Sequence, residues 1–175
     1  MRSIIQKKGQ VWVETVLYTL IGLAIIGIVL AVAKPKIDEM KDEIVINQII
    51  ESMSSIDEKV GEVDSVEGNR RSIDLKVGDG EFVVDGVNNM IIWRINSDYQ
   101  YSEEDVVVDI GDFNVLTTKG DPWTVEIMRP YDFDIRFDSV DEEKVLEESS
   151  APYSVYVENL GRNDDGKAIV SFTAD

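Results

Sequence analysis

The sequence predicts an α+β protein, in which a long N-terminal helix precedes an antiparallel β-sandwich or barrel-like domain. Two observations predict this fold. Residues 15–33 are uncharged and mostly apolar, and apolar residues then recur at helical spacing up to residue 63. From residue 70 onward, apolar and polar residues alternate as in half-buried strands, with turn residues at close spacing. A chain of 175 residues accommodates one domain of ordinary size and an appendage.

The composition excludes several classes of function. The formal net charge is −18, and nucleic-acid binding needs clustered Lys and Arg, so nucleic acid is not expected as a primary ligand. The chain has no His and no Cys, which removes the commonest general base and metal ligand, thiolate chemistry and disulfides. We therefore expect neither an enzyme nor a bound cofactor.

The charge is distributed unevenly along the chain. Arg2, Lys7 and Lys8 precede the apolar run with no acidic residue among them, whereas the chain from Lys34 onward holds 14 basic and 34 acidic residues. Basic flanks of a membrane span stay on the cytoplasmic side. The sequence therefore predicts a cytoplasmic N-terminus and an acidic body outside the cell.

The uncharged run TVLYTLIGLAIIGIVLAVA, from Thr15 to Ala33, is long enough to cross a membrane. As an α-helix its 19 residues span about 28 Å, close to the hydrocarbon thickness of a bilayer. A soluble core helix of this length would show a polar stripe, so lipid or other such helices must be the partners. The run alone fits a plain single-span anchor, and Ala31 to Ala33 also supply the small residues of a secretory cleavage site.

A third interpretation comes from the junction KKGQVWVE. Together with the apolar run it resembles the amino terminus of archaeal type IV pilin-like proteins, over about the first 35 residues. In that family a prepilin peptidase cuts a class III signal peptide after a glycine on the cytoplasmic side, and the apolar helix stays on the mature subunit. The resemblance implies a cut between Gly9 and Gln10, with Arg2, Lys7 and Lys8 as the basic residues of the leader.

Two residues, Gln10 and Glu14, make the resemblance to this family more specific. Gln10 stands where the family often has phenylalanine, and glutamine at this place is similar to many archaeal members. Glu14 falls on the family's acidic residue at mature position five, so the resemblance implies that Glu14 pairs with the cationic α-amine of a neighbouring subunit during assembly. The simpler interpretation places Glu14 in the headgroup region, solvated or paired with Lys8.

The resemblance also implies an organisation and a set of partners. Residues 1–9 would be the cytoplasmic leader, 10–34 the transmembrane and filament-core helix, 35–63 an amphipathic helix and 70–175 an extracellular β domain. The implied partners are a prepilin peptidase, an assembly ATPase, a membrane platform protein and further copies of the chain in a helical surface filament, with membrane lipid around the helix before assembly. The alternative is a membrane-anchored or secreted β domain that binds a ligand or partner without polymerising.

The segment after Pro35 has the apolar spacing of an amphipathic helix. Proline removes a backbone donor and crowds the preceding turn, so a kink or a break is expected at Pro35. The helix is expected to end near Gly61. Its stripe, which covers one face of the following domain, is led by Ile37, Met40 and Ile44 and continues through Ile46, Ile49, Ile50, Met53, Ile56, Val60 and Val63.

Seven or eight short strands are expected from Arg70 onward. They are carried by RSIDLKV, EFVVD, NMIIWRI, DVVVDI, WTVEIM, YDFDIRF, PYSVYVENLG and KAIVSF. DVVVDI has the composition of a buried strand, and the Asp-Gly of RNDDG predicts a hairpin between the last two strands. The stretch SVDEEKVLEES, residues 139–149, is expected to form a short exposed helix.

The sequence of the β domain contains only weak patterns for a calcium site or a sugar-binding site. The acidic residues of NDDG and DFDIRFD lack the full calcium-loop pattern that ends in glutamate, and alternating acids on a strand ordinarily form its solvated face. The aromatic residues are more typical of core or inter-subunit packing than of a sugar-binding platform. They are Trp93, Trp123, Tyr99, Tyr101, Tyr131, Tyr153 and Tyr156.

Overall fold

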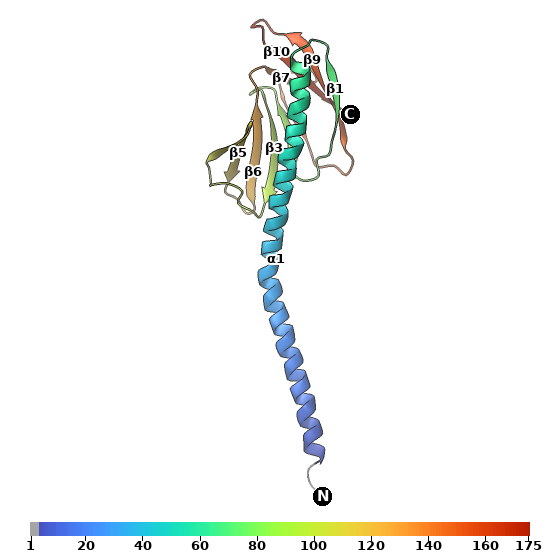
Figure 1. The fold of residues 1–175 in the computed structure, drawn as a ribbon, viewed down its shortest axis with the longest axis vertical. Coiled ribbons are helices and arrows are strands. Elements are labelled where there is room, and N and C mark those ends of the chain that lie inside the picture. Colours follow the sequence, from blue (N-terminus) through green and yellow to red (C-terminus); the bar gives the residue numbers. More distant parts are fainter. Residues whose placement is uncertain (1–3) are drawn as a thin grey trace. The chain divides into compact units, whose positions relative to one another are not determined.

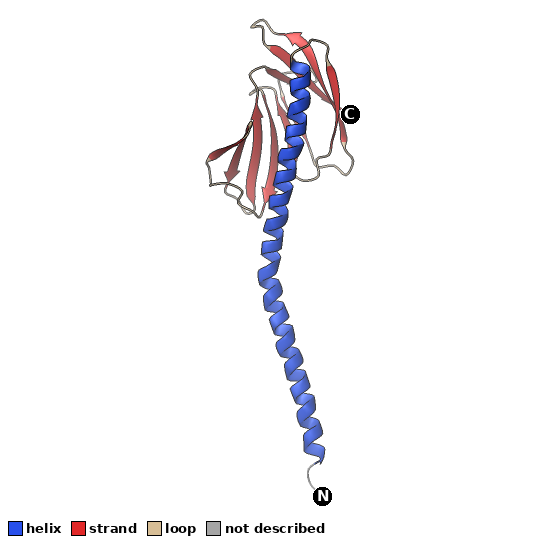
Figure 2. Cartoon of the chain, viewed as in Figure 1, coloured by secondary structure: helices blue, strands red, loops and turns tan. Residues whose placement is uncertain are grey.

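The computed structural model describes residues 4–175, and the side chains of residues 11–175. It confirms the α+β fold, since one long helix is followed by two β-sheets (Figures 1 and 2). The chain divides into two compact units, residues 1–40 and 41–175, and all the strands belong to the second unit.

A single helix, α1 (Ile4–Asp64), contains both helical segments that the sequence pattern separates at Pro35. The predicted break at Pro35 is therefore wrong. Proline costs the helix one hydrogen bond, to the carbonyl of Ala31, and both residues are exposed, so the freed carbonyl is not buried. The helix ends at Asp64, three residues beyond the predicted Gly61.

The second half of α1 is amphipathic, as predicted, but its buried stripe begins later than expected. The buried residues are at most 4% exposed and follow one another at spacings of three and four: Ile46, Ile49, Met53, Ile56, Val60 and Val63. The three residues predicted to lead the stripe, Ile37, Met40 and Ile44, are 51%, 62% and 54% exposed. Ile44 and Ile46 are two residues apart, which is about 200° around a helix, so the three leading residues lie on the face opposite the buried stripe.

The larger sheet is antiparallel throughout, with the strand order β4-β5-β6-β3-β2-β8. Its strands are β2 (Glu81–Asp85), β3 (Met90–Ser97), β4 (Val107–Ile110), β5 (Phe113–Thr118), β6 (Trp123–Pro130) and β8 (Glu143–Leu146). The predicted helix at residues 139–149 is wrong, because β8 occupies this stretch and places Leu146, 5% exposed, beside Phe82 of β2. The prediction that DVVVDI is buried is also wrong, since β4 is an exposed edge strand.

The smaller sheet has the strand order β1-β9-β10-β7 and contains one parallel pair, β10 with β7. Its strands are β1 (Arg70–Leu75), β7 (Asp134–Phe137), β9 (Tyr153–Arg162) and β10 (Ala168–Ala174). The predicted hairpin between β9 and β10 is confirmed, and its turn uses Gly166 at a φ of +78°. The two sheets hold ten strands instead of seven or eight, because β5 and β8 were not expected.

One hydrophobic core joins the second half of α1 to both sheets. Met53 of α1, Phe82 and Trp93 of the larger sheet and Phe172 of the smaller sheet are buried in the same cluster. The Trp93 indole N–H donates to the Asp79 carbonyl at 2.9 Å, and its ring meets Phe82 edge-on with 5.8 Å between centroids. Figure 1 shows this half of the helix running along the two sheets. The second unit therefore has a core of its own without disulfides.

The C-terminal end of α1 is capped from a distant strand. Asn159 of β9, which is 3% exposed, donates from Nδ2 to the carbonyls of Val63 at 2.9 Å and Asp64 at 2.6 Å. Its side-chain oxygen accepts the N–H of Gly161 at 2.8 Å. The last carbonyls of a helix have no partner within the helix, so Asn159 supplies donors that α1 itself lacks.

Candidate functional site

The predicted processing site lies at the start of α1. The backbone of Lys7, Lys8, Gly9 and Gln10 is helical, but their side chains lie outside the described residues, and Arg2 lies outside them altogether. The cut between Gly9 and Gln10 therefore stays a prediction from the junction KKGQVWVE.

The described part of the first unit is apolar on every side over residues 11–33. Each of its large apolar side chains is at least 39% exposed: Val11, Trp12, Val13, Val16, Leu17, Tyr18, Leu20, Ile21, Leu23, Ile25, Ile26, Ile28, Val29, Leu30 and Val32. Because successive residues point in different directions around a helix, this stretch has no polar face to present to water. By length and composition, α1 is able to cross a membrane.

Glu14 is the one charged residue between Val11 and Ala33. The other polar groups are largely satisfied within the helix, since the Thr15 hydroxyl donates to the Val11 carbonyl at 2.9 Å and the Thr19 hydroxyl to the Thr15 carbonyl at 2.8 Å. A charged side chain at the centre of a bilayer costs about 2.5–3.5 kcal/mol on insertion scales. Glu14 is exposed and places the charge of this stretch near its start.

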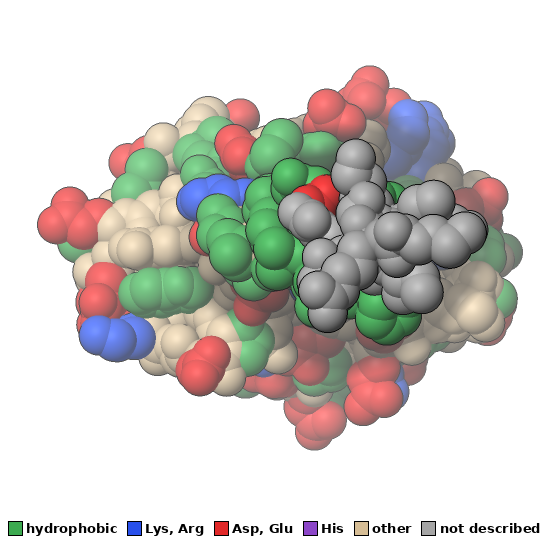
Figure 3. All heavy atoms as spheres, turned by 90° about the horizontal axis from the view of Figure 1, so that it is seen from below, with side chains coloured by type: hydrophobic (Ala, Val, Ile, Leu, Met, Phe, Trp, Pro, Cys, Tyr) green, Lys and Arg blue, Asp and Glu red, His purple; other side chains and the backbone are tan. Residues whose placement is uncertain are grey.

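The surface of the β domain is acidic, and its basic side chains are largely taken up by ion pairs. Figure 3 shows many carboxylates and few basic groups on the face that it displays. Arg94 bonds to Glu81 and, at 2.7 Å, to Glu126, while Arg129 bonds to Asp57 at 2.8 Å. The surface consequently presents excess negative charge, which keeps a domain soluble and opposes its self-association.

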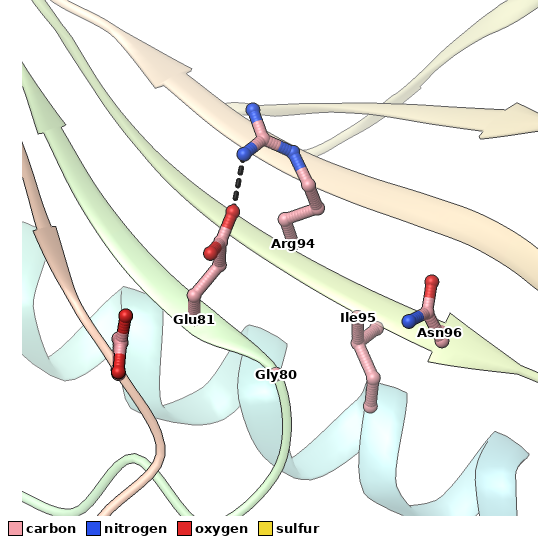
Figure 4. A pocket seen from close by; sticks show the side chains of 6 residues that line it. Gly80, Glu81, Arg94, Ile95 and Asn96 are labelled. Carbon is pink, nitrogen blue, oxygen red and sulfur yellow. Dashed lines mark hydrogen bonds and ion pairs between the residues drawn. The ribbon is translucent and has the colours of Figure 1, made fainter.

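Arg94 and Glu81 help to line an open hollow of about 270 Å³, and Figure 4 shows their side chains pointing toward one another. The hydrogen bond to Glu126, and after it the bond to Glu81, raises the pKa of Arg94. The rest of the lining comes from Gly80, Ile95, Asn96 and Glu147, with no hydroxyl or thiol nucleophile among these residues. The hollow thus contains an arginine that bonds to two carboxylates.

The described side chains, residues 11–175, contain no group of three or more acidic residues placed to hold a metal ion. Trp93 belongs to the core, with 2% exposure. Tyr99 and Tyr101 form one ring pair, with 6.3 Å between centroids, and Tyr131 stacks separately on Phe133 at 5.0 Å. The aromatic residues therefore pack in separate places and do not line one platform.

The sequence pattern did not single out a second surface, the free edge of β4. Val106, Val107 and Val108 are 42%, 51% and 36% exposed there. A local signal was present, because acidic residues enclose the three valines on both sides in EEDVVVDIGD. Charges at both ends of a short apolar run are typical of an edge strand, whereas a central strand is flanked by turns.

No protein-family model, curated protein or solved structure matches the chain. The fold and the apolar stretch define a class, a β-rich domain that follows a helix able to span a membrane. The resemblance to a narrower family depends on the junction KKGQVWVE and the apolar run that follows it.

Proposed function

We propose that the chain is a structural subunit of an archaeal type IV pilus-like surface filament, assembled through the apolar half of α1. The observation that carries the proposal is the stretch from Val11 to Ala33, which is exposed on every side and has one carboxylate near its start. Lipid and a bundle of such helices are equally apolar surroundings, so packing and polar pairing decide the transfer from one to the other.

Glu14 supplies the polar pairing. A cut after Gly9 creates an α-amine on Gln10, four residues before Glu14 and therefore on the same face of the helix. When helices bundle, the amine of one subunit pairs with Glu14 of its neighbour. Such a pair acts mainly on axial register, because a subunit at the wrong height leaves a buried carboxylate without its cation.

The partners follow from this mechanism. The prepilin peptidase makes the cut on the cytoplasmic side, and the assembly ATPase and membrane platform protein drive subunits out of the bilayer. Arg2, Lys7 and Lys8 keep the leader in the cytoplasm, so the acidic β domain is exported. Like charges on neighbouring domains repel, and the helices consequently provide most of the attraction between subunits.

Mass spectrometry of the mature amino terminus tests the processing step. A terminus at Gln10, including its cyclised pyroglutamate form, is expected from membranes of an archaeal host that expresses the full chain. A terminus at Met1 would indicate an anchored domain that is not processed, and one at Lys34 would indicate a secreted domain. Either of these two results contradicts the proposal.

Replacing Glu14 with alanine tests the assembly step. Glu14→Ala should insert into the membrane normally and lose most of its filaments, counted by electron microscopy of sheared cells, because the register pair is absent. Thr15→Ala is the matched control, since the Thr15 hydroxyl bonds only to its own helix among the described contacts. A normal filament yield from Glu14→Ala would remove the proposed role of Glu14.

A further inference from the structure

Two of the four edge strands in the sheets are protected. At the edge of β7, the Ile135 N–H donates to Oδ1 of Asn89 at 2.9 Å, and the Phe137 N–H donates to the Val140 carbonyl at 3.1 Å. β8 carries Lys144, whose Nζ lies 5.6 Å from the centroid of the Phe137 ring. A lysine on an edge strand discourages pairing with another chain. The edges that remain are those of β1 and β4.

The register of β4 shows which of its backbone groups are free. β4 and β5 form a hairpin whose two-residue turn is Gly111–Asp112 and whose closing pair is Ile110 with Phe113. In an antiparallel pair, alternate residues bond to the partner strand, beginning with the pair next to the turn. Val107 and Asp109 therefore direct their N–H and C=O groups away from β5.

The same reasoning applies to β1. The Asn159 N–H donates to the Asn69 carbonyl at 3.0 Å, which fixes the phase of the ladder between β1 and β9. Every second residue from there bonds to β9, so Arg70, Ser72 and Asp74 direct their backbone groups outward. All three are exposed. The Arg70 carbonyl accepts from Nη1 of Arg71 at 3.0 Å, and the other outward groups of these two edges have no backbone partner among the described residues.

The two edges differ in charge, although β1 also contains Asp74. Residues 103–112, which include β4, contain five acidic residues and no basic one. β1 begins with Arg70 and Arg71, the one place between residues 41 and 175 where two basic residues are adjacent. Arg71 bonds to Glu62 at 2.6 Å, but the Arg70 side chain is 51% exposed, and its nitrogen lies 3.7 Å from the nearest oxygen of Glu158.

We propose that β4 of one copy pairs with β1 of the next copy, so that the β domains form a continuous strand-paired row along the filament. This inference rests on the proposed function, because filament assembly brings copies side by side. Pairing of β4 with β4 would bring ten acidic residues together, whereas pairing of β4 with β1 brings Arg70 toward the acidic residues beside β4. The charges therefore favour the mixed pair over pairing of β4 with itself.

The position of the edges agrees with an open assembly. Figure 1 shows β1 and β5, the neighbour of β4, on opposite sides of the β domain. A contact between two different surfaces repeats from copy to copy, and it continues as an open helix wherever the rotation between copies does not close a ring. Strand addition satisfies the outward backbone groups and covers the exposed valines from Val106 to Val108.

Cysteine cross-linking in assembled filaments tests the pairing, in a chain that has no cysteine of its own. The double variant Ser72→Cys with Val107→Cys, treated with a short bismaleimide, should give a ladder of covalent multimers on denaturing gels. Each single variant should stay monomeric. The matched control is Ser72→Cys with Lys144→Cys, which places the second cysteine on the protected strand β8 and should give no ladder.

The outcomes separate this inference from the proposed function. Intact filaments without a ladder from the double variant, or covalent dimers from Val107→Cys alone, overturn the pairing and leave the filament proposal standing. If the unsubstituted chain forms no filaments, the filament proposal fails and the pairing fails with it. As a second measurement, Arg70→Glu should lower filament yield several-fold while Arg70→Lys retains it, and equal yields would overturn the pairing.

Discussion

The two halves of α1 share one backbone conformation but differ in what they need around them. From residue 11 to residue 33 the helix is apolar and exposed on every side, whereas from Ile46 to Val63 it buries one stripe in the core of its own domain. The second half packs its apolar stripe against the strands of its own chain. The first half has no such cover in the described residues, and by length and composition it is able to cross a membrane.

Removing residues 1–40 gives the largest expected effect. The fragment 41–175 keeps the complete core and loses the apolar stretch, so it should stay soluble without detergent and unfold cooperatively. The full chain should require detergent or lipid. Size-exclusion chromatography and circular dichroism during heating measure both properties. A fragment that aggregates or unfolds without a transition would show that the second unit is not self-sufficient.

Two isoleucines on the second half of α1 provide the next comparison. Ile46 is fully buried and Ile44 is 54% exposed. Ile46→Ala should lower the free energy of unfolding by about 2–5 kcal/mol, because it removes buried apolar surface and leaves a cavity. Ile44→Ala should change it by less than about 0.5 kcal/mol. Urea denaturation of the two variants measures the difference, and equal losses would contradict the observed start of the stripe.

The local sequence pattern was enough to predict a long helix, the strands that follow it and the change from one to the other near residue 70. The apolar run, the stripe from Ile46 onward and eight of the strands can be predicted from the spacing of apolar residues within each segment. The start of the stripe does not, because Ile37 and Ile44 keep helical spacing with each other, but Ile44 is two residues, about 200° around the helix, from Ile46 and so lies on the other face. Burial is decided by contacts with distant segments.

The errors among the strands have the same origin. β8 has the composition EKVL, which suits an exposed helix as well as an edge strand, and only its pairing with β2 decides between them. The valines of β4 predict burial, but the strand lies at the end of the sheet order. Asn159 gives no local sign of capping a helix that ends 95 residues earlier. At the candidate site, Glu14 was identified from its position in the apolar run, and Gly9 and Gln10 were identified from a family resemblance.

The cap at the end of α1 gives a smaller expected effect. Asn159→Ala removes the donors to the carbonyls of Val63 and Asp64 and leaves the Gly161 N–H without its acceptor. Unsatisfied buried groups of this kind cost about 1–3 kcal/mol. Asn96→Ala, at an exposed position on β3, is the control and should change stability by less than about 0.5 kcal/mol. If the two variants unfold at the same urea concentration, Asn159 does not anchor the helix.

The smallest effect concerns the contact between α1 and the larger sheet, and it appears only in alkali. Burial, and after it the nearby carboxylate of Asp57 on α1, raises the pKa of Tyr131 above its ordinary value of about 10. The folded protein therefore keeps the phenolic proton at a pH where the unfolded chain has released it. Since the unfolded state then binds fewer protons, stability falls as the pH rises above about 10.

Tyr131→Phe tests this dependence while it keeps the ring that stacks on Phe133. The Tyr131 hydroxyl is buried near the Asp57 carboxylate, and its removal should change the free energy of unfolding at pH 7 by about 1 kcal/mol or less. Above pH 10 the variant should lose less stability per pH unit than the unsubstituted protein. Urea denaturation at pH 7, 10 and 11 measures the two slopes. Identical slopes would show that the contact of α1 with the sheet does not depend on keeping this proton.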